Sequence, residues 1–189
     1  MNSLDRSDVI DTARLVLFPM TVEFYLASLE GDQEQASRLI GLDVPEEWFL
    51  SRRLIEIRLA QLKRDPDLLP WLLRAVGLRE RSQMIGHIGF HNRPGAEYLL
   101  EFAPGGVELG YTIYPEHRRR GYAGEACATL MDWAQREHRV SRFVVSIGPQ
   151  NMPSLRIAGR FGFQKVGMQL DEEDGPEHIF VREVPAIEG

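Results

Sequence analysis

The sequence has little of what several classes of protein require. It holds a single cysteine, Cys127, which excludes an internal disulfide and leaves no thiolate cluster for structural zinc. Its most apolar segment, residues 68–78, is short and is interrupted by Arg74, so no membrane-spanning helix is predicted there. The acidic start also lacks the apolar stretch of a secretion signal, and we therefore expect a cytoplasmic protein without a membrane part.

Positive charge is scarce as well. The chain has 22 lysines and arginines against 28 aspartates and glutamates, which gives a net charge of −6. This balance argues against a protein whose whole surface binds nucleic acid, so any anion site must be local. The Walker motif, the G-x-G-x-x-G dinucleotide motif and the G-x-S-x-G nucleophile motif are all absent.

The rest of the composition is that of an ordinary globular protein. Of the 189 residues, 43% are hydrophobic and 26% are charged, which favours one domain over residues 1–189. The first ten or so residues need not be ordered. No internal repeat and no linker divides the chain.

The first half of the sequence predicts strands and helices in alternation. Residues 12–20 favour a strand, and a helix follows from a Thr21 cap to Gly31. Residues 45–64 predict one long amphipathic helix with Leu50, Leu54 and Ile57 on its apolar face. Three strands follow at hairpin-like intervals, and antiparallel pairing is their simplest arrangement: residues 70–78, 83–91 and 107–114.

The second half begins with a helix after residue 124. A buried strand over residues 142–148 follows, because its apolar run is nearly unbroken. Asn151 is placed to cap a short helix that closes at Gly162, and a final strand pair surrounds the acidic turn at residues 171–177.

The stretch PEHRRRGYAGE, residues 115–125, joins a predicted strand to a predicted helix. Exposed amides at a helix start can hold phosphate, and the helix dipole favours the negative charge. Gly121 can take a positive φ, while Ala123 and Gly124 permit close approach of a ligand to the backbone. A basic surface turn or an import-type tag is the alternative that composition leaves open.

Four features resemble the GNAT N-acetyltransferase superfamily. Arg118-x-x-Gly121-x-Ala123 matches its R/Q-x-x-G-x-G/A pyrophosphate loop. The opening T-x-R-L-x-L from Thr12, the E-L-G-Y from Glu108 and the N-x-x-S…F-G-F from Asn151 resemble the branch that contains the Rim-type ribosomal-protein N-terminal acetyltransferases. The likeness spans roughly residues 10–184.

The resemblance implies an α/β (α+β) fold and a cosubstrate. The expected architecture is a mixed, mostly antiparallel central sheet that is splayed in the middle and flanked by helices on both faces. The loop would bind the pyrophosphate of acetyl-CoA, and the splay would admit its pantetheine arm. The residues expected to bind the cofactor are Ile113, Arg118, Arg119, Arg120, Gly121, Tyr122, Ala123, Gly124, Asn151 and Ser154. For Asn151 a purely structural role as helix cap is equally well supported.

The family chemistry is direct attack of an amine on the thioester, without a covalent enzyme intermediate. The resemblance makes Glu108 the candidate base, and partial burial would raise its pKa toward neutrality. Ser154 is the candidate that protonates the leaving thiolate; Tyr122 is a second choice, because the tyrosine of many relatives is replaced by Ala158. The alternatives are a strand-edge glutamate paired with an arginine and a serine that satisfies the helix backbone.

Other polar residues have weaker claims. His87 and His91 alternate along one strand, which fits a base or substrate-binding role or simply polar strand positions. Glu101 and the acidic turn compete as groups that attract an amine. No histidine, cysteine or carboxylate set has a convincing metal spacing, so we predict no metal.

The leading hypothesis is therefore an acetyl-CoA-dependent N-acetyltransferase that acts on a primary amine, either a protein N-terminus or a small molecule. A catalytically inactive CoA-binding sensor is the runner-up, and a nucleic-acid binder that uses the three arginines is the least favoured. By family analogy, residues 34–64 and the loop after Gly175 wall the acceptor groove. Monomer and homodimer both remain open.

Overall fold

The computed structural model describes residues 9–171 and 175–186, which form two compact units. The first unit contains the described residues up to Gly89 together with Tyr111–Leu130, and the second contains the remainder. Strand β5 and helix α5 contribute to both units, because the chain passes from one unit to the other within them. The single-domain assignment stays a prediction, and the expectation for the N-terminal stretch falls mostly on residues outside those described.

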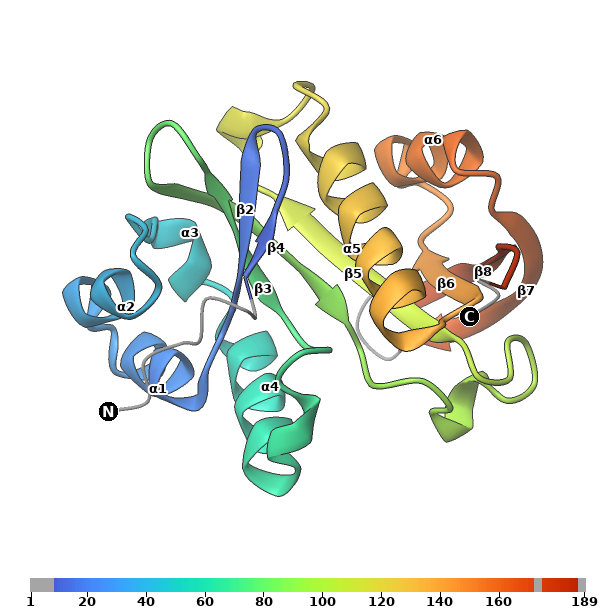
Figure 1. The fold of residues 1–189 in the computed structure, drawn as a ribbon, viewed down its shortest axis with the longest axis horizontal. Coiled ribbons are helices and arrows are strands. Elements are labelled where there is room, and N and C mark those ends of the chain that lie inside the picture. The colour runs from blue at the N-terminus through green and yellow to red at the C-terminus, as the bar shows by residue number, and fades with distance from the viewer. Residues whose placement is uncertain (1–8, 172–174, 187–189) are drawn as a thin grey trace. The chain divides into compact units, whose positions relative to one another are not determined.

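The first unit contains an antiparallel sheet in the order β1-β2-β3-β4, with the end of β5 beside β4 (Figure 1). The Tyr114 amide donates to the Ile85 carbonyl at 2.9 Å, and a Cβ on Gly86 would overlap the backbone oxygen of Thr112. Only glycine therefore permits this close pairing. The strands are β1 Ile10–Asp11, β2 Leu15–Pro19, β3 Arg74–Leu78, β4 Gln83–Phe90 and β5 Val107–Ile113.

Four helices of the first unit form much of its core. The predicted helix after Thr21 is confirmed: Thr21 accepts from the Phe24 amide, and Gly31 ends the helix at φ 75°. Trp48 is fully buried and its indole N–H donates to Ser28 Oγ at 2.8 Å, which fixes the chain between α1 and α4. The helices are α1 Val22–Glu30, α2 Gln33–Ile40, α3 Glu46–Phe49 and α4 Arg52–Arg64.

The prediction of one helix over residues 45–64 is wrong. The helical path breaks at Ser51, whose ψ of 34° cannot continue it, and Leu50 is 84% exposed. Ile57 is exposed too, so the apolar face lies elsewhere on α4: its buried residues are Ile55, Arg58, Leu59 and Leu62. Because of the break, the short α3 can place Trp48 in the core while α4 takes a different rotation about its own axis.

The second unit carries the strand order β5-β6-β8-β7. The start of β5 pairs in parallel with β6 (Arg142–Ile147) only at Val107 and Glu108, whereas β6 pairs with β8 (Gly175–Glu183) along its whole length. Strand β7 (Gln164–Asp171) completes the antiparallel part. The mixed, mostly antiparallel arrangement is confirmed, and the parallel pairing of β5 with β6 is short, as a sheet splayed in its middle requires.

Two helices flank these strands. Helix α5 (Tyr122–His138) starts within the predicted phosphate loop, and α6 (Met152–Arg160) follows the Asn151 cap. Cys127 is buried in α5, as predicted, and burial raises the pKa of its thiol. None of the helices in the described part of the chain is long and apolar enough to cross a membrane.

Gly86→Ala tests the close approach of β4 and β5. The added methyl group would meet a backbone oxygen that cannot move aside, so we expect the free energy of unfolding to fall by about 3 kcal/mol or more. Gly159→Ala in α6 is the control: its Cβ would meet nothing within 4 Å, and the change should be neutral or stabilising. Urea denaturation measures both. Equal midpoints for the two variants would contradict the packing argument.

Candidate functional site

The loop between β5 and α5 has an unusual backbone. It follows the 3-10 turn η4 (Pro115–His117), and both Arg119 and Gly121 take positive φ, at 61° and 81°. The prediction for Gly121 is confirmed. A positive φ at a residue other than glycine is uncommon and costs energy, so the strain at Arg119 marks a loop whose shape is enforced by its surroundings.

The loop presents a run of amides without protein acceptors. Within residues 9–171 and 175–186, the backbone N–H groups from Arg119 to Gly124 donate to no other residue, whereas the Arg118 amide donates to Pro115 O and the Glu125 amide to Gly121 O. The first amides of a helix have no partner within the helix, and its dipole adds positive potential there. This is the arrangement that binds phosphate groups.

The three arginines of the loop differ in their contacts. Arg118 Nε donates to the Ile113 carbonyl at 2.8 Å, so this side chain ties the loop to the end of β5. Arg119 and Arg120 are exposed. Arg118 therefore has a bracing contact that the sequence did not indicate, while its neighbours carry their charge at the loop surface.

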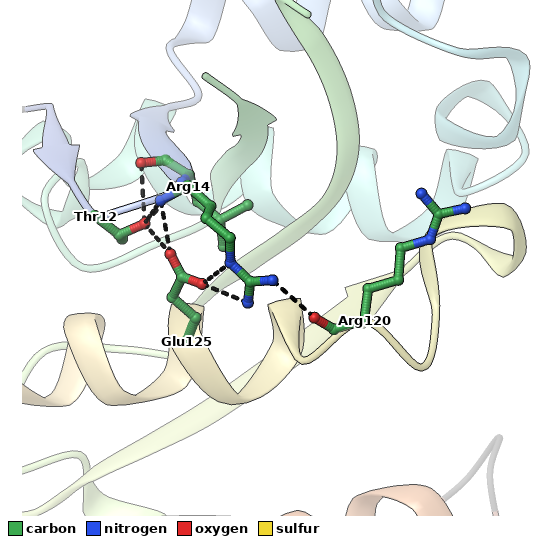
Figure 2. A network of polar contacts seen from close by, with 5 residues as sticks. Thr12, Arg14, Arg120 and Glu125 are labelled. Carbon is green, nitrogen blue, oxygen red and sulfur yellow. Dashed lines mark hydrogen bonds and ion pairs between the residues drawn. The ribbon is translucent and has the colours of Figure 1, made fainter. Parts of the chain in front are cut away.

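Arg14 and Thr12 hold the start of α5 from the turn between β1 and β2 (Figure 2). The Glu125 carboxylate accepts from Thr12 Oγ1 and the Arg14 amide, and it forms an ion pair at 2.7 Å with the Arg14 guanidinium. Arg14 also donates to the Arg120 carbonyl at 3.0 Å and lies 4.7 Å from the centre of the Tyr122 ring. Figure 2 shows the guanidinium between Glu125 and the Arg120 carbonyl.

The same contacts set the charge state of Glu125. Burial raises the pKa of Glu125. The hydrogen bonds from Thr12 and Arg14 and the charge of Arg14 lower it by more, so the pKa lies below its ordinary value. Sequence reasoning gave Arg14 no role. The signal was the T-x-R-L motif, which was recognised as a family feature without a contact to explain it.

Glu108 lies in the second unit and is 5% exposed. Ser146 Oγ donates to one carboxylate oxygen at 2.6 Å, and His91 Nδ1 lies 3.3 Å from the other. Burial raises the pKa of Glu108, but hydrogen bonds from His91, Ser146 and Tyr98, with the charge of His91, lower it more. The expectation of a pKa raised toward neutrality is therefore wrong, because donors surround the buried carboxylate.

The Glu108 cluster continues in two directions. Gln169 Nε2 donates to Ser146 Oγ and to Glu177, both at 3.2 Å. On the other side the His91 side chain is 40% exposed, and a Cβ on Gly110 would come within 2.7 Å of its Nε2. The alternative partner, an arginine, is not found beside Glu108 in the part of the chain that the structure describes.

Asn151 and Ser154 adopt the cap geometry. Asn151 Oδ1 accepts from the Ser154 amide at 3.2 Å at the start of α6. The Ser154 hydroxyl is half-buried and has no hydrogen-bond partner among the described residues. Ala158 is buried, so the position that carries a tyrosine in many relatives offers no hydroxyl here. The contacts of Asn151 and Ser154 with a cofactor remain predictions.

His87 belongs to the core of the first unit. It is 6% exposed and packs edge-on against Trp48 and Tyr114, with ring centroids 5.5 and 6.4 Å away. Burial lowers the pKa of His87 to about 4, with a smaller contribution from Arg58, so the ring is neutral at physiological pH. This favours the interpretation of His87 as a strand residue over a role as base.

The structure adds little evidence for the remaining acidic candidates, Glu101 and the acidic turn. Glu101 is exposed, and residues 172–174 of the acidic turn lie outside the described residues. Among the described residues no group of three or more histidine, cysteine, aspartate or glutamate side chains could hold a metal ion.

A family model for the acetyltransferase (GNAT) domain matches residues 14–164. The chain belongs to the GNAT acetyltransferase family. The matched range includes the loop at the start of α5, Glu108 and the Asn151 cap. The resemblance that the sequence motifs indicated is thereby confirmed for the family.

Proteins with similar sequences are named as N-acetyltransferases. YnaD from Bacillus subtilis, an uncharacterized N-acetyltransferase, is 29% identical over 48% of this chain and 48% of its own. YoaA from the same species, also an uncharacterized N-acetyltransferase, is 28% identical over 85% of each chain. The GNAT chain thus spans about half the length of YnaD and most of YoaA.

Solved structures share the fold at low identity. An acetyltransferase from Agrobacterium tumefaciens is 23% identical, with a TM-score of 0.60 over 93% of this chain and 94% of that one. The ribosomal-protein-S5-alanine acetyltransferase from Vibrio fischeri is 12% identical, with a TM-score of 0.61 over 93% and 96%. The microcin C7 self-immunity acetyltransferase MccE, solved with acetyl-CoA and AMP, is 16% identical, with a TM-score of 0.62 over 96% and 99%.

Glu108→Gln tests the charge state of the buried cluster. A carboxylate whose pKa is lowered by folding stabilises the fold above its unfolded pKa, near 4.5, and this contribution is lost as pH falls through the lower folded value. We expect the difference in unfolding free energy between the wild type and Glu108→Gln to shrink between about pH 5 and pH 3.

Urea denaturation across that pH range measures the difference. Glu80→Gln, a change at an exposed turn residue, is the control for general effects of acid. A wild type that gains stability over Glu108→Gln as pH falls would mean that the carboxylate is destabilised by burial after all.

Proposed function

We propose that the protein is an acetyl-CoA-dependent N-acetyltransferase that moves an acetyl group to a primary amine by direct attack in a ternary complex. The observation that carries the proposal is the run of amides from Arg119 to Gly124, which have no acceptor among the described residues and which include the two residues of positive φ, Arg119 and Gly121. Family membership supports it, as does the acetyl-CoA in the structure of MccE.

The loop would hold the diphosphate of CoA. Its amides donate to phosphate oxygens, and Ala123 and Gly124 leave the backbone accessible because their side chains are small. Arg119 and Arg120 would add charge at the surface of an acidic protein. Arg118 would contribute mainly by bracing the loop against Ile113, since its Nε is already used there.

The pantetheine arm and thioester would involve three other residues. We expect the backbone around Ile113 to pair with the arm, and Asn151 to reach it while it caps α6. Ser154 is the proposed donor to the departing thiolate, and its hydroxyl has no competing partner among the described residues. In the reaction the amine nitrogen forms a bond to the acetyl carbon, the carbon–sulfur bond breaks, and the thiolate takes a proton.

An amine is mostly protonated at neutral pH, so transfer requires a proton acceptor. We propose that Glu108 acts as the base through His91 and water: His91 Nε2 takes the proton from the amine, and the ionised Glu108 stabilises the charge that His91 then carries. Glu108 stays ionised because its pKa is lowered, and it is buried, whereas its partner His91 is partly exposed. When His91 is neutral and donates Nδ1–H to the carboxylate, the lone pair is on Nε2, the nitrogen that lies beside Gly110.

A CoA-binding sensor without catalysis is the second candidate, favoured by the buried Ala158 where many relatives place a tyrosine. Knowing the acceptor class, a protein N-terminus or a small-molecule amine, would not distinguish the enzyme from the sensor. A binding assay and a turnover assay together do, since only the enzyme releases CoA thiol in the presence of an amine.

Gly121→Glu tests the loop as the diphosphate site. The new side chain would be strained at φ 81° and would bring negative charge to the amides, so we expect affinity for CoA to fall by at least about tenfold. Isothermal titration calorimetry measures it, with Arg136→Ala, an exposed arginine later on α5, as control. CoA binding that survives Gly121→Glu unchanged would remove the loop from the site.

Glu108→Gln tests the base. The change removes the carboxylate that holds His91, so we expect kcat with acetyl-CoA and an amine panel to fall by about a hundredfold. Because the pKa of Glu108 is lowered, the loss should be similar at every pH above its ordinary value of 4.5. Thiol release from pH 6 to 9 measures it, and full activity in Glu108→Gln would exclude the role. Silence of the wild type across the panel, with CoA still bound, would favour the sensor.

A further inference from the structure

The T-x-R-L motif is a sequence feature that the proposed function does not use. Its arginine, Arg14, lies between β1 and β2, far in sequence from the loop before α5, yet it makes contacts with three residues of that segment: Arg120, Tyr122 and Glu125. The Arg14 side chain donates to the Arg120 backbone, lies over the Tyr122 ring and pairs with the Glu125 carboxylate.

The contact with Arg120 sets the direction of one peptide group. Arg14 donates to the Arg120 carbonyl oxygen at 3.0 Å, as Figure 2 shows. In a trans peptide the C=O and the following N–H point in opposite directions. No cis peptide occurs here, so the Gly121 amide points away from Arg14 and donates to no residue that the structure describes.

The contact with Glu125 neutralises a carboxylate that could compete with a bound anion. Glu125 is in the first turn of α5, where its carboxylate is close to the same amides and helix dipole that would attract a diphosphate. Arg14 Nε and Nη2 both lie 2.7 Å from one carboxylate oxygen, Oε2, and Thr12 Oγ1 donates to the other. The carboxylate is thus held and neutralised on the side of the β1–β2 turn.

The two contacts come from one rigid planar group. A guanidinium has five donors in a fixed fork, so Arg14 can bind Glu125 with one edge and the Arg120 carbonyl with another. A Cβ placed on Gly121 would lie 3.4 Å from Arg14 Nη2, which shows how closely the loop packs on this side chain. A lysine has a single nitrogen and cannot span both acceptors in the same way.

We propose that Arg14 is a positioning residue for the diphosphate loop: it fixes the Arg120–Gly121 peptide with its amide outward and keeps the Glu125 charge from competing with the phosphate groups. This inference rests on the proposed binding of CoA by that loop. Arg14 acts through the loop backbone, so it should affect binding of the nucleotide part of acetyl-CoA and leave the chemical step unchanged.

Arg14→Ala, Arg14→Lys and Glu125→Gln test the proposal, with Arg79→Ala as matched control. Arg79, which follows β3, pairs with Asp11 of β1 at 2.6 Å and has almost the same exposure as Arg14. The contacts of its side chain, with Asp11 and with the Thr12 carbonyl, do not reach the loop. We expect the Kd for CoA to rise about tenfold in Arg14→Ala, to rise less in Arg14→Lys and to stay unchanged in Arg79→Ala.

Kinetics and stability complete the experiment. KM for acetyl-CoA should rise with Kd in Arg14→Ala, while kcat and KM for the amine stay as in the wild type. Thermal denaturation establishes that each variant is folded; if Arg14→Ala is not, Arg14→Lys takes its place, because lysine keeps the positive charge and cannot span both acceptors. Arg14→Ala combined with Glu125→Gln should lose less affinity than Arg14→Ala alone, because the released Glu125 charge is then absent and cannot compete with the phosphate groups.

The outcomes separate the two proposals. Wild type that binds no CoA overturns the proposed function, whatever the variants do. If folded Arg14→Ala binds CoA with the same Kd as the wild type, the positioning role is overturned and the proposed function stands. An equal loss in Arg79→Ala would also overturn it, because the effect would then come from the hairpin as a whole.

Discussion

The structure depends on a set of backbone amides that are kept away from the protein's own acceptors. Between β5 and α5 the chain adopts positive φ at Arg119 and Gly121, and the amides up to Gly124 stay without a protein partner among the described residues. Buried or structured amides are normally paired, so an exposed run at a helix start is available to bind an anion. The neighbouring contacts of Arg118 and Arg14 keep the loop in this conformation.

The Glu108 cluster follows a different principle. A buried carboxylate would ordinarily resist ionisation, but three donors reverse that tendency. The result is a fixed negative charge that orients His91, and the polar chain through Ser146 and Gln169 fixes the carboxylate from the other side. In the proposed reaction the partly exposed histidine, rather than a carboxylate of raised pKa, is the group that meets the proton.

Local signals predicted much of the fold. The caps at Thr21 and Asn151, the unbroken apolar run of β6 and the positive φ at Gly121 are each determined by residues that lie close together in sequence. The helix break at Ser51 could not be predicted in this way, because it depends on how Trp48 packs against α1.

The sequence motifs named candidate site residues but not the contacts that those residues make. The motifs named Glu108 and the loop, and the family model supports the assignment of the family. The direction of the Glu108 pKa shift depends on His91, Ser146 and Tyr98, which come from other parts of the chain. Ser146 lies 38 positions from Glu108, and Glu125 lies 111 positions from Arg14. Burial alone suggested the wrong sign, because the number of donors around a carboxylate cannot be read from strand periodicity.

The most direct test of the central claim follows the loop amides themselves. In two-dimensional amide NMR spectra, addition of CoA should shift the resonances of Gly121, Ala123 and Gly124, and inorganic pyrophosphate should shift the same resonances at higher concentration, while pantetheine leaves them unmoved. If CoA binds and these amides do not respond, the diphosphate lies elsewhere and the account of the loop is contradicted.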